Sequence, residues 1–465
     1  MRHRHLAMVG GLCLFTLAAA CAGSGRPSAR VTRPPAAAAA DTAAAPATIA
    51  RGSTRRELGK VDPACNGGRG IHLEADQGYV DQIVTVETSR GVTLVAFDTM
   101  TSGDSPIGRA LIYAITSRCT IDRSFGSDGS VSPSIPGVAA STGFGLASGR
   151  DGKFFVLSGR RRMTLIGEFD RNGSIDTSFG VRGWASFVAP GGVAHYGAYV
   201  ADMIQEPDGN ILAFANNAEA HYETRAYIFD LHADGTVDRG FGDEGHLSVF
   251  PRMTYAWQVL DEPDGSIALT GSLGGGGCYT MPIEWLTADG VPETQADANY
   301  IAAHSFPSKL ASSATNFVDP AGGVGVIGEV TPDCDRIHRS ARPYEAIEEL
   351  NPDGSPDRHF GHDGMLRIAT TNSANFDFSA TQTGEGHLVL QGYGSGDDPY
   401  LYLQDLEKDG STVPGFGHHG VVRLRFPELD NNQEAIPADV LSGPNGDIMI
   451  AAPVGNGVTI EEIAS

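Results

Sequence analysis

The chain has 465 residues and a formal net charge of −23. Its length is sufficient for a large core or for several stacked units. A surface this acidic repels phosphate backbones, so the composition excludes nucleic acid as an expected partner and favours solubility.

The first 21 residues are typical of an export signal. Arg2 and Arg4 precede an apolar stretch at 6–17, which is too short to span a bilayer. The stretch runs into Leu-Ala-Ala-Ala-Cys21, which resembles a bacterial lipoprotein signal, although the leucine lies one position further upstream than usual. We therefore predict lipidation at Cys21. Ordinary secretion with cleavage in the alanine run is the alternative.

Residues 22–60 are rich in Ala, Pro, Ser and Thr and show no hydrophobic periodicity. This composition predicts a disordered tether, which would hold the folded part away from a membrane. The strand patterns described below all lie in residues 61–465, which we expect to form one folded domain.

Two phrases alternate along this domain, and both predict tight turns. The first is Asp-x-x-Phe-Gly-x-x-Gly or a variant of it, and the second is Pro-Asp-Gly between two short apolar runs, as at 207–209 and 263–265. In the second phrase proline presets φ, the aspartate bonds locally and the glycine takes a positive φ. Copies of the first phrase centre on Phe125, Phe179, Phe241, Phe360 and Phe416.

Each repeat predicts four short strands, named a to d. In one copy we expect them at 200–205, 211–215, 226–231 and 246–250. Because no stretch shows helical periodicity, the fold class is all-β. Copies of the first phrase recur at spacings of 54, 62 and 56 residues, which suits the four-stranded blade of a β-propeller, and the units number seven.

The two ends of the repeat region predict how the ring closes. Residues 436–463 supply strands a, b and c of a last unit without strand d. Residues 62–75 align with 356–369, a c–d turn followed by strand d, and no strand precedes them. We therefore expect the N-terminal strand to pair into the C-terminal blade, which removes a free sheet edge.

Six cysteines fit an oxidising compartment. Two belong to the signal segment, which leaves four. In the repeat register Cys65 and Cys119 fall in c–d turns of neighbouring blades, and Cys278 and Cys334 fall in b–c loops of consecutive blades. We predict the disulfides Cys65–Cys119 and Cys278–Cys334.

The two phrases resemble the delta-60 repeat family, whose unit is Pro-Asp-Gly-x-Ile-x-Val-x-Gly followed by Leu-x-x-Asp-Gly-x-x-Asp-x-x-Phe-Gly-x-x-Gly. The resemblance covers residues 62–465 and is strong at 350–364, 231–245 and 169–183. In the copy that contains Asp289-Gly290, the Phe-Gly part that should follow is missing. It implies a propeller-like repeat on a secreted or surface protein. It implies no activity and no catalytic residue, because the family's members are mostly of unknown function.

Some side chains that could bind a ligand are explained more simply by folding. Asp176, Asp238 and Asp357 recur at one turn position, where we expect them to accept backbone N–H bonds. The repeated phenylalanines are expected to anchor neighbouring blades. Four histidines in matching turns could bind zinc together, but we expect solvated turns with no metal and no cofactor. They are His359, His362, His418 and His419.

The face that carries the b–c loops is where propellers usually function. Two long b–c loops, at 272–281 and 329–344, carry aromatic and basic side chains that would suit an anionic ligand. These predicted ligand-binding residues are Tyr279, Arg336, His338, Arg339, Arg342 and Tyr344.

We expect a monomeric, non-catalytic surface module in the bacterial cell envelope, anchored in the membrane by its lipid, which binds a protein or a glycan. The alternative is a secreted hydrolase or lyase that acts on a cell-wall or extracellular glycan through carboxylates or a metal at the mouth of the channel. Glu284, Glu345 and Glu348 are candidates for a carboxylate pair, but acidic residues are abundant enough in this chain for clustering by chance. No catalytic residue is assigned.

Overall fold

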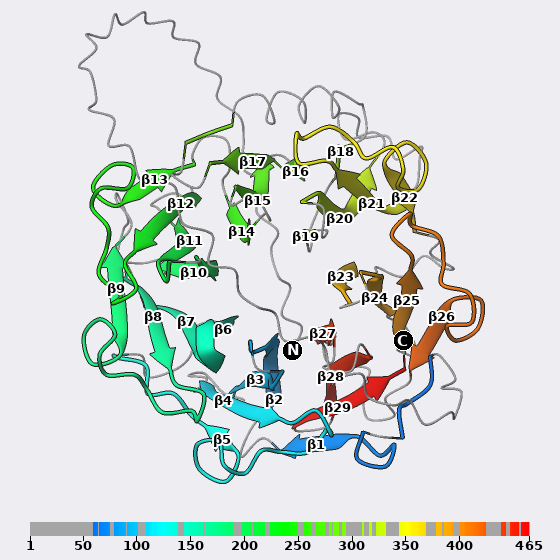
Figure 1. Cartoon of the computed structure of the whole chain (residues 1–465), viewed down its shortest axis with the longest axis horizontal. Coiled ribbons are helices and arrows are strands. Elements are labelled where there is room, and N and C mark those ends of the chain that lie inside the picture. The colour runs from blue at the N-terminus through cyan, green and yellow to red at the C-terminus, as the bar shows by residue number, and fades with distance from the viewer. Residues whose placement is uncertain are drawn as a thin grey trace, which may run out of the picture. The chain divides into compact units, whose positions relative to one another are not determined.

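A computed structural model shows that the chain forms a seven-bladed β-propeller, as the sequence predicts. Each blade is an antiparallel sheet, and the blades form a ring with strands β2, β6, β10, β14, β19, β23 and β27 towards the centre (Figure 1). The structure describes residues 59–63, 65–74, 79–89, 91–100, 108–137, 144–160, 163–188, 198–206, 208–218, 224–249, 255–261, 266–274, 279–280, 282–287, 291–293, 309–310, 316–318, 322–331, 344–368, 378–383, 386–394, 400–424, 439–442, 447–454 and 457–464.

The strands of the blades follow one another along the chain. Blade 1 consists of β2 (Tyr79–Glu87), β3 (Thr93–Met100), β4 (Gly108–Ile115) and β5 (Ser130–Val131). Blade 2 consists of β6 (Phe144–Ser148), β7 (Phe154–Arg160), β8 (Met163–Phe169) and β9 (Trp184–Val188). Blade 3 consists of β10 (Ala198–Gln205), β11 (Ile211–Ala218), β12 (Thr224–Leu231) and β13 (His246–Ser248). Blades 4 and 5 consist of β14 (Tyr255–Asp261), β15 (Ile267–Gly274), β16 (Tyr279–Thr280) and β17 (Ile283–Leu286); and β18 (Lys309–Leu310), β19 (Asn316–Val318), β20 (Val324–Thr331), β21 (Tyr344–Leu350) and β22 (Met365–Arg367). Blades 6 and 7 consist of β23 (Phe378–Gln382), β24 (Leu388–Gly394), β25 (Tyr400–Leu406) and β26 (Val421–Leu424); and β27 (Asp439–Ser442), β28 (Ile448–Val454), β29 (Gly457–Ile463) and β1 (Ile71–Glu74).

Helix is nearly absent from the described residues, where the one helical element is the 3-10 turn η1 (Arg150–Gly152). No helix in this part of the chain has the length and apolar character needed to cross a bilayer. Seven clusters of buried apolar side chains form the core, and each of them joins two neighbouring blades.

The ring closes as predicted, because β1 pairs antiparallel with β29. The c–d turn of this blade is assembled from two segments far apart in sequence. Gly59 N–H donates to Ala464 C=O at 2.6 Å, Ala464 N–H to Lys60 C=O at 2.9 Å, and Asp62 N–H to Glu462 C=O at 2.8 Å. Blade 5 makes the same three bonds within one continuous turn. The fold therefore includes residues 59 and 60, which the composition assigns to the tether, whereas residues 1–58 lie outside the described part.

A phenylalanine in the c–d turn of one blade packs against the next blade. A Cβ atom added to Gly173 would lie 3.2 Å from the Phe125 ring, and one added to Gly235 would lie 2.9 Å from the Phe179 ring. Both glycines have a positive φ. The absence of a Cβ atom in glycine allows both this turn conformation and the close contact with the ring. All five repeated phenylalanines are buried, which confirms their predicted role as anchors between blades.

Two sets of backbone bonds fix these turns. The N–H that follows the phenylalanine donates to a carbonyl of the next blade, as from Gly180 to Asp234 at 2.7 Å. The turn aspartates accept the N–H two residues further on, at 2.9 Å for Asp176, 2.7 Å for Asp238 and 2.9 Å for Asp357. This confirms the structural role predicted for the three aspartates.

At the junction of blades 7 and 1, cysteines take both positions of the phenylalanine–glycine contact. Cys65 stands at the phenylalanine position and Cys119 at the glycine position, and the φ of Cys119 is 51°, positive like that of the glycines. They form the predicted disulfide, with their Cα atoms 4.8 Å apart. The predicted pair Cys278–Cys334 lies outside the described residues and stays a prediction.

Replacing both Cys65 and Cys119 with serine should lower the free energy of unfolding by roughly 3 kcal/mol, because the disulfide restrains the segment that carries β1. Denaturant titration under non-reducing conditions measures this loss. Limited proteolysis should then cut first within 59–74. A variant that unfolds at the same denaturant concentration as the parent would contradict the closing role of this bond.

Candidate functional site

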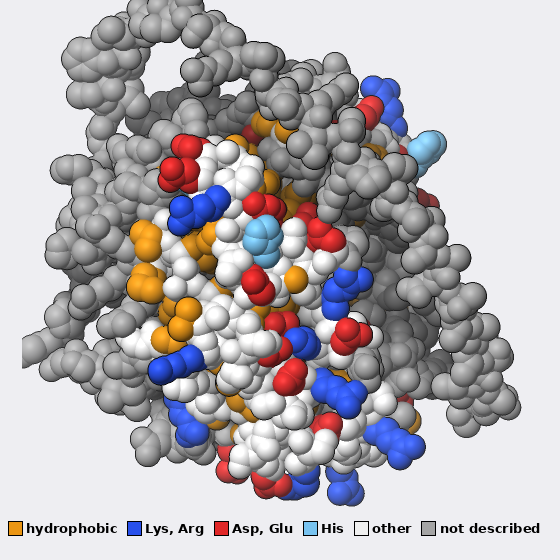
Figure 2. Space-filling model, turned by 60° about the vertical axis from the view of Figure 1, so that its left-hand side comes forward, with side chains coloured by type: hydrophobic (Ala, Val, Ile, Leu, Met, Phe, Trp, Pro, Cys, Tyr) orange, Lys and Arg blue, Asp and Glu red, His pale blue; other side chains and the backbone are white. Residues whose placement is uncertain are grey.

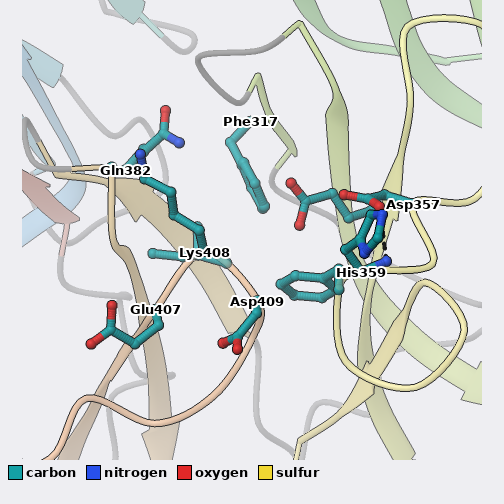
Figure 3. A pocket seen from close by; sticks show the side chains of 11 residues that line it. Phe317, Asp357, His359, Gln382, Glu407, Lys408 and Asp409 are labelled. Atoms are coloured by element: carbon teal, nitrogen blue, oxygen red, sulfur yellow. Dashed lines mark hydrogen bonds between the residues drawn. The ribbon is translucent and has the colours of Figure 1, made fainter.

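An open notch of about 430 Å³ lies between blades 5 and 6, on the face of the a–b and c–d turns (Figure 3). Blade 5 contributes Asp357 and His359 from its c–d turn. Blade 6 contributes Gln382 from the end of β23 and Lys408 from its c–d turn. Phe317 of β19 also lines the notch.

The turns hold the acidic side chains of the notch in place. The Asp357 carboxylate accepts the His359 N–H at 2.9 Å, and the Asp409 carboxylate accepts the Ser411 N–H at 2.8 Å. The hydroxyl and N–H of Ser411 hold the pKa of Asp409 below its ordinary value. Asp409 is therefore a carboxylate at neutral pH, although it lies on an acidic protein.

The notch has an apolar base and a charged rim. Phe360 and Leu388 form the base together with Phe317, and all three are almost completely buried. Lys408 lies over the a–b turn, because a Cβ added to Gly386 would meet its Cε at 2.6 Å. The four carboxyl groups of the lining, set against this one ammonium, are Glu349, Asp357, Glu407 and Asp409.

A second notch, of about 440 Å³, occupies the equivalent place between blades 1 and 2. Here Asp122 and Ser124 stand at the positions of Asp357 and His359, while Arg171 and Asn172 replace the lysine and the aspartate of blade 6. Its lining therefore holds a single carboxylate beside a guanidinium. The notch is a product of the repeat, whereas its charge is set blade by blade.

Acidic and basic side chains are intermingled over the described residues on the side of the molecule shown in Figure 2. Neither sign forms an extended field there. On that side, electrostatic selection would therefore depend on local groups of side chains.

Charged groups also meet inside individual blades, where strands b and c reach the c–d turn. In blade 2 the Lys153 ammonium lies 3.1 Å from Glu168 and 2.7 Å from Asp176. In blade 6 His387 stands at the position of Lys153. Its ring nitrogens lie 3.4 Å from Asp405 and 3.5 Å from Glu407.

In blade 7 a third carboxyl group takes the position that Lys153 has in blade 2. Asp62, Asp447 and Glu462 are all buried, and their oxygens lie within 4.8 Å of one another. Such a set could hold a cation. Among the described residues the only other set of this kind contains the disulfide cysteines.

The four histidines considered for zinc are exposed on the c–d turns of blades 5 and 6. The rings of His418 and His419 contact each other, with centroids 4.3 Å apart. None of the four belongs to a converging set of three donors within the described part of the chain.

The ligand-binding loops predicted from the sequence are largely outside the described residues. Arg336, His338, Arg339 and Arg342 are not described. Tyr279 begins β16, and Tyr344 begins β21, where the Arg367 guanidinium lies 4.2 Å above its ring. Of the carboxylates considered for catalysis, Glu284 is buried in β17, and Glu345 and Glu348 lie in β21. None of the three lines either notch.

Two aspartates link neighbouring inner strands. Asp202 of β10 accepts the N–H of Val259 in blade 4 at 3.1 Å, and Asp439 of β27 accepts the N–H of Thr85 in blade 1 at 2.6 Å. The Asp202 side chain keeps a partly exposed surface, but the inner strands surround the carboxyl group closely. Burial raises the pKa of Asp202 to about 7, against the opposite effect of its N–H donors.

No family model matches the chain, and no curated protein sequence matches it. Its resemblance to the delta-60 repeat family therefore stays a prediction. Many solved structures share the fold. A protein of unknown function from Dyadobacter fermentans is 10% identical, with a TM-score of 0.42, over 85% of this chain and 99% of that one.

Two further similar solved structures are named as enzymes. The polysaccharide lyase Uly1 is 10% identical, with a TM-score of 0.43, over 84% of this chain and 91% of its own. The sialidase NanB from Streptococcus pneumoniae is 9% identical, with a TM-score of 0.40, over 85% of this chain and 70% of its own. At this level of sequence identity and TM-score, the similarity does not indicate an activity for this chain.

Replacing Asp202 with asparagine should flatten the pH dependence of stability between about pH 4 and 7. The folded protein keeps the Asp202 proton up to a pKa of about 7, while the unfolded chain loses it near 3.8, so the parent loses stability as pH rises through this window. Melting temperatures at several pH values measure the slope. Asp234→Asn, in an exposed turn of the same blade, is the control. A parent slope retained in Asp202→Asn would contradict the assignment.

Replacing Lys153 with methionine should lower the free energy of unfolding by about 1–3 kcal/mol near pH 7, because Glu168 and Asp176 lose their cation. Lys153 and Ser178 lower the pKa of Asp176 to about 2, so the Asp176 part of this stabilisation is present above pH 4 and is lost as pH falls towards 2. Burial raises the pKa of Glu168, so its ion pair with Lys153 is lost at a higher pH. The difference between the two proteins should therefore shrink in acid. Denaturant titrations at pH 7 and pH 3 measure it, and equal differences at both would contradict the ion-pair explanation.

Proposed function

We propose that the protein is a lipid-anchored propeller of the bacterial cell envelope, which binds a glycan without transforming it. The observation that carries the proposal is the notch between blades 5 and 6. A small apolar base under a rim of fixed polar groups is the usual composition of a small-ligand site. The recurrence of the notch between blades 1 and 2 with a different lining supports binding by a rigid frame with changeable side chains.

Location in the envelope is supported by the Cys65–Cys119 disulfide, since such bonds persist in oxidising compartments. The lipid anchor at Cys21 and the tether remain predictions from the sequence. The basic b–c loops remain a proposed second contact surface. It is tested by alanine replacement of Arg336, Arg339 and Arg342, which should weaken binding of acidic glycans and leave binding of neutral glycans unchanged.

Replacing Cys21 with serine should move the protein from the membrane fraction to the medium or the periplasm, because the lipid is its only proposed anchor. Immunoblots of fractions washed at high salt measure the shift. Cys13→Ser lies within the signal segment and serves as the control, with membrane association retained. A Cys21→Ser protein that stays in the washed membranes would overturn the anchor.

Binding and turnover are separated with the same Cys21→Ser protein. Isolated cell-wall polysaccharide should retain it in a sedimentation assay, without release of reducing ends or unsaturated sugars over a long incubation. Release of either product would favour the hydrolase or lyase instead. Absence of retention would contradict glycan binding.

A further inference from the structure

We propose that the notch between blades 5 and 6 binds an amino sugar whose amino group is free and positively charged. The proposal rests on the glycan-binding function and names the class of ligand for this site. It is carried by three properties of the notch, which are its charge, its mixture of hydrogen-bonding groups and its base.

The charge of the lining selects a cation. Asp357 and Asp409 face the notch from two neighbouring blades, and each uses one carboxylate oxygen to accept a turn N–H. Lys408 supplies the one ammonium of the lining. Glu407 and Glu349 also line the notch, but Glu407 lies 3.5 Å from His387 and Glu349 is almost completely buried, so the selection of a cation rests on Asp357 and Asp409. An ammonium group of a ligand would make charge-assisted hydrogen bonds here, which are the strong ones. An anionic sugar would meet an excess of like charge.

The uncharged groups favour a ligand with hydroxyl groups over a simple alkylamine. Gln382 offers both an amide donor and an amide acceptor, and His359 offers ring nitrogens on the opposite side. Sugar hydroxyls both donate and accept, so they can use all of these groups. A metal ion would leave the amide N–H groups and Lys408 without a role.

The base and the size of the notch fit a sugar unit. Phe317, Phe360 and Leu388 give an apolar base on which the C–H face of a pyranose ring can lie. The volume of about 430 Å³ lies within the range of roughly 300–1,000 Å³ that is usual for small-molecule sites. The notch is open, so a longer glycan can continue out of it.

The notch between blades 1 and 2 provides a natural contrast. It has nearly the same volume, about 440 Å³, and Asp122 repeats the position of Asp357. Arg171 and Asn172 replace Lys408 and Asp409, so the excess of carboxylates is absent there. We expect no preference for a charged amino sugar at this second notch.

The test compares two probes with the same sugar backbone, a glucosamine trisaccharide and its fully N-acetylated form, in which each charged amine is replaced by a neutral acetamide. Isothermal titration of the full-length chain in detergent should show the free amine binding at least about 10-fold more tightly. The double variant Asp357→Asn/Asp409→Asn should lose about 10-fold or more of this affinity. Asparagine can preserve the turn at position 409, because Asn172, at the corresponding position of blade 2, accepts the Ser174 N–H at 2.9 Å.

Asp122→Asn is the matched control, since it removes a carboxylate at the same repeat position from the other notch. Its affinity for the free amine should equal that of the parent. Melting temperatures of all variants confirm that they fold. An equal loss in Asp122→Asn would show general attraction to an acidic protein and overturn the site.

The remaining outcomes separate this inference from the proposed function. Equal binding of both trisaccharides would overturn the selection of charge and leave glycan binding intact. No binding of either probe by the folded parent would overturn the inference, while retention on cell-wall polysaccharide would still support the proposed function. Spermidine binding as tightly as the free-amine trisaccharide would overturn the requirement for a sugar.

Discussion

The contact between each c–d turn and the next blade is the interaction on which the ring depends. A phenylalanine lies against a glycine of the neighbouring turn, and the following N–H bonds to a carbonyl there, as between Phe179, Gly180 and the turn that holds Gly235. Any side chain at the glycine would enter the space of the ring. Because the contact repeats between blades, it fixes both their spacing and the notches that they leave.

At the junction of blades 7 and 1, a disulfide takes the place of this phenylalanine–glycine contact. β1 reaches blade 7 from the far end of the sequence, and backbone hydrogen bonds and apolar packing join it to β29. Cys65 and Cys119 both precede the later blades in the chain, so their bond fixes the turn before β1 onto blade 1. The last blade then pairs with an edge that is already in position, which lowers the entropy lost on closure.

Much of the fold could be predicted from the sequence because its determinants are local. A Pro-Asp-Gly turn, a turn aspartate and a buried phenylalanine each act within a few residues, and the register of the repeat then placed Cys65 opposite Cys119. The notch could not be predicted in this way. Asp357 was explained by its turn bond, and Asp409 lies 52 residues further along the chain. Only the packing of two blades shows that both carboxylates face one space.

A structural role for a turn aspartate therefore does not exclude a role in binding. The turn bond needs one side-chain oxygen, and aspartate and asparagine supply it equally well: Asn172 accepts its N–H at 2.9 Å and Asp409 at 2.8 Å. Folding accordingly places little demand on the charge at this position. The second carboxylate oxygen and the negative charge of Asp409 remain available to a ligand, and this freedom allows one rigid frame to carry notches of different charge.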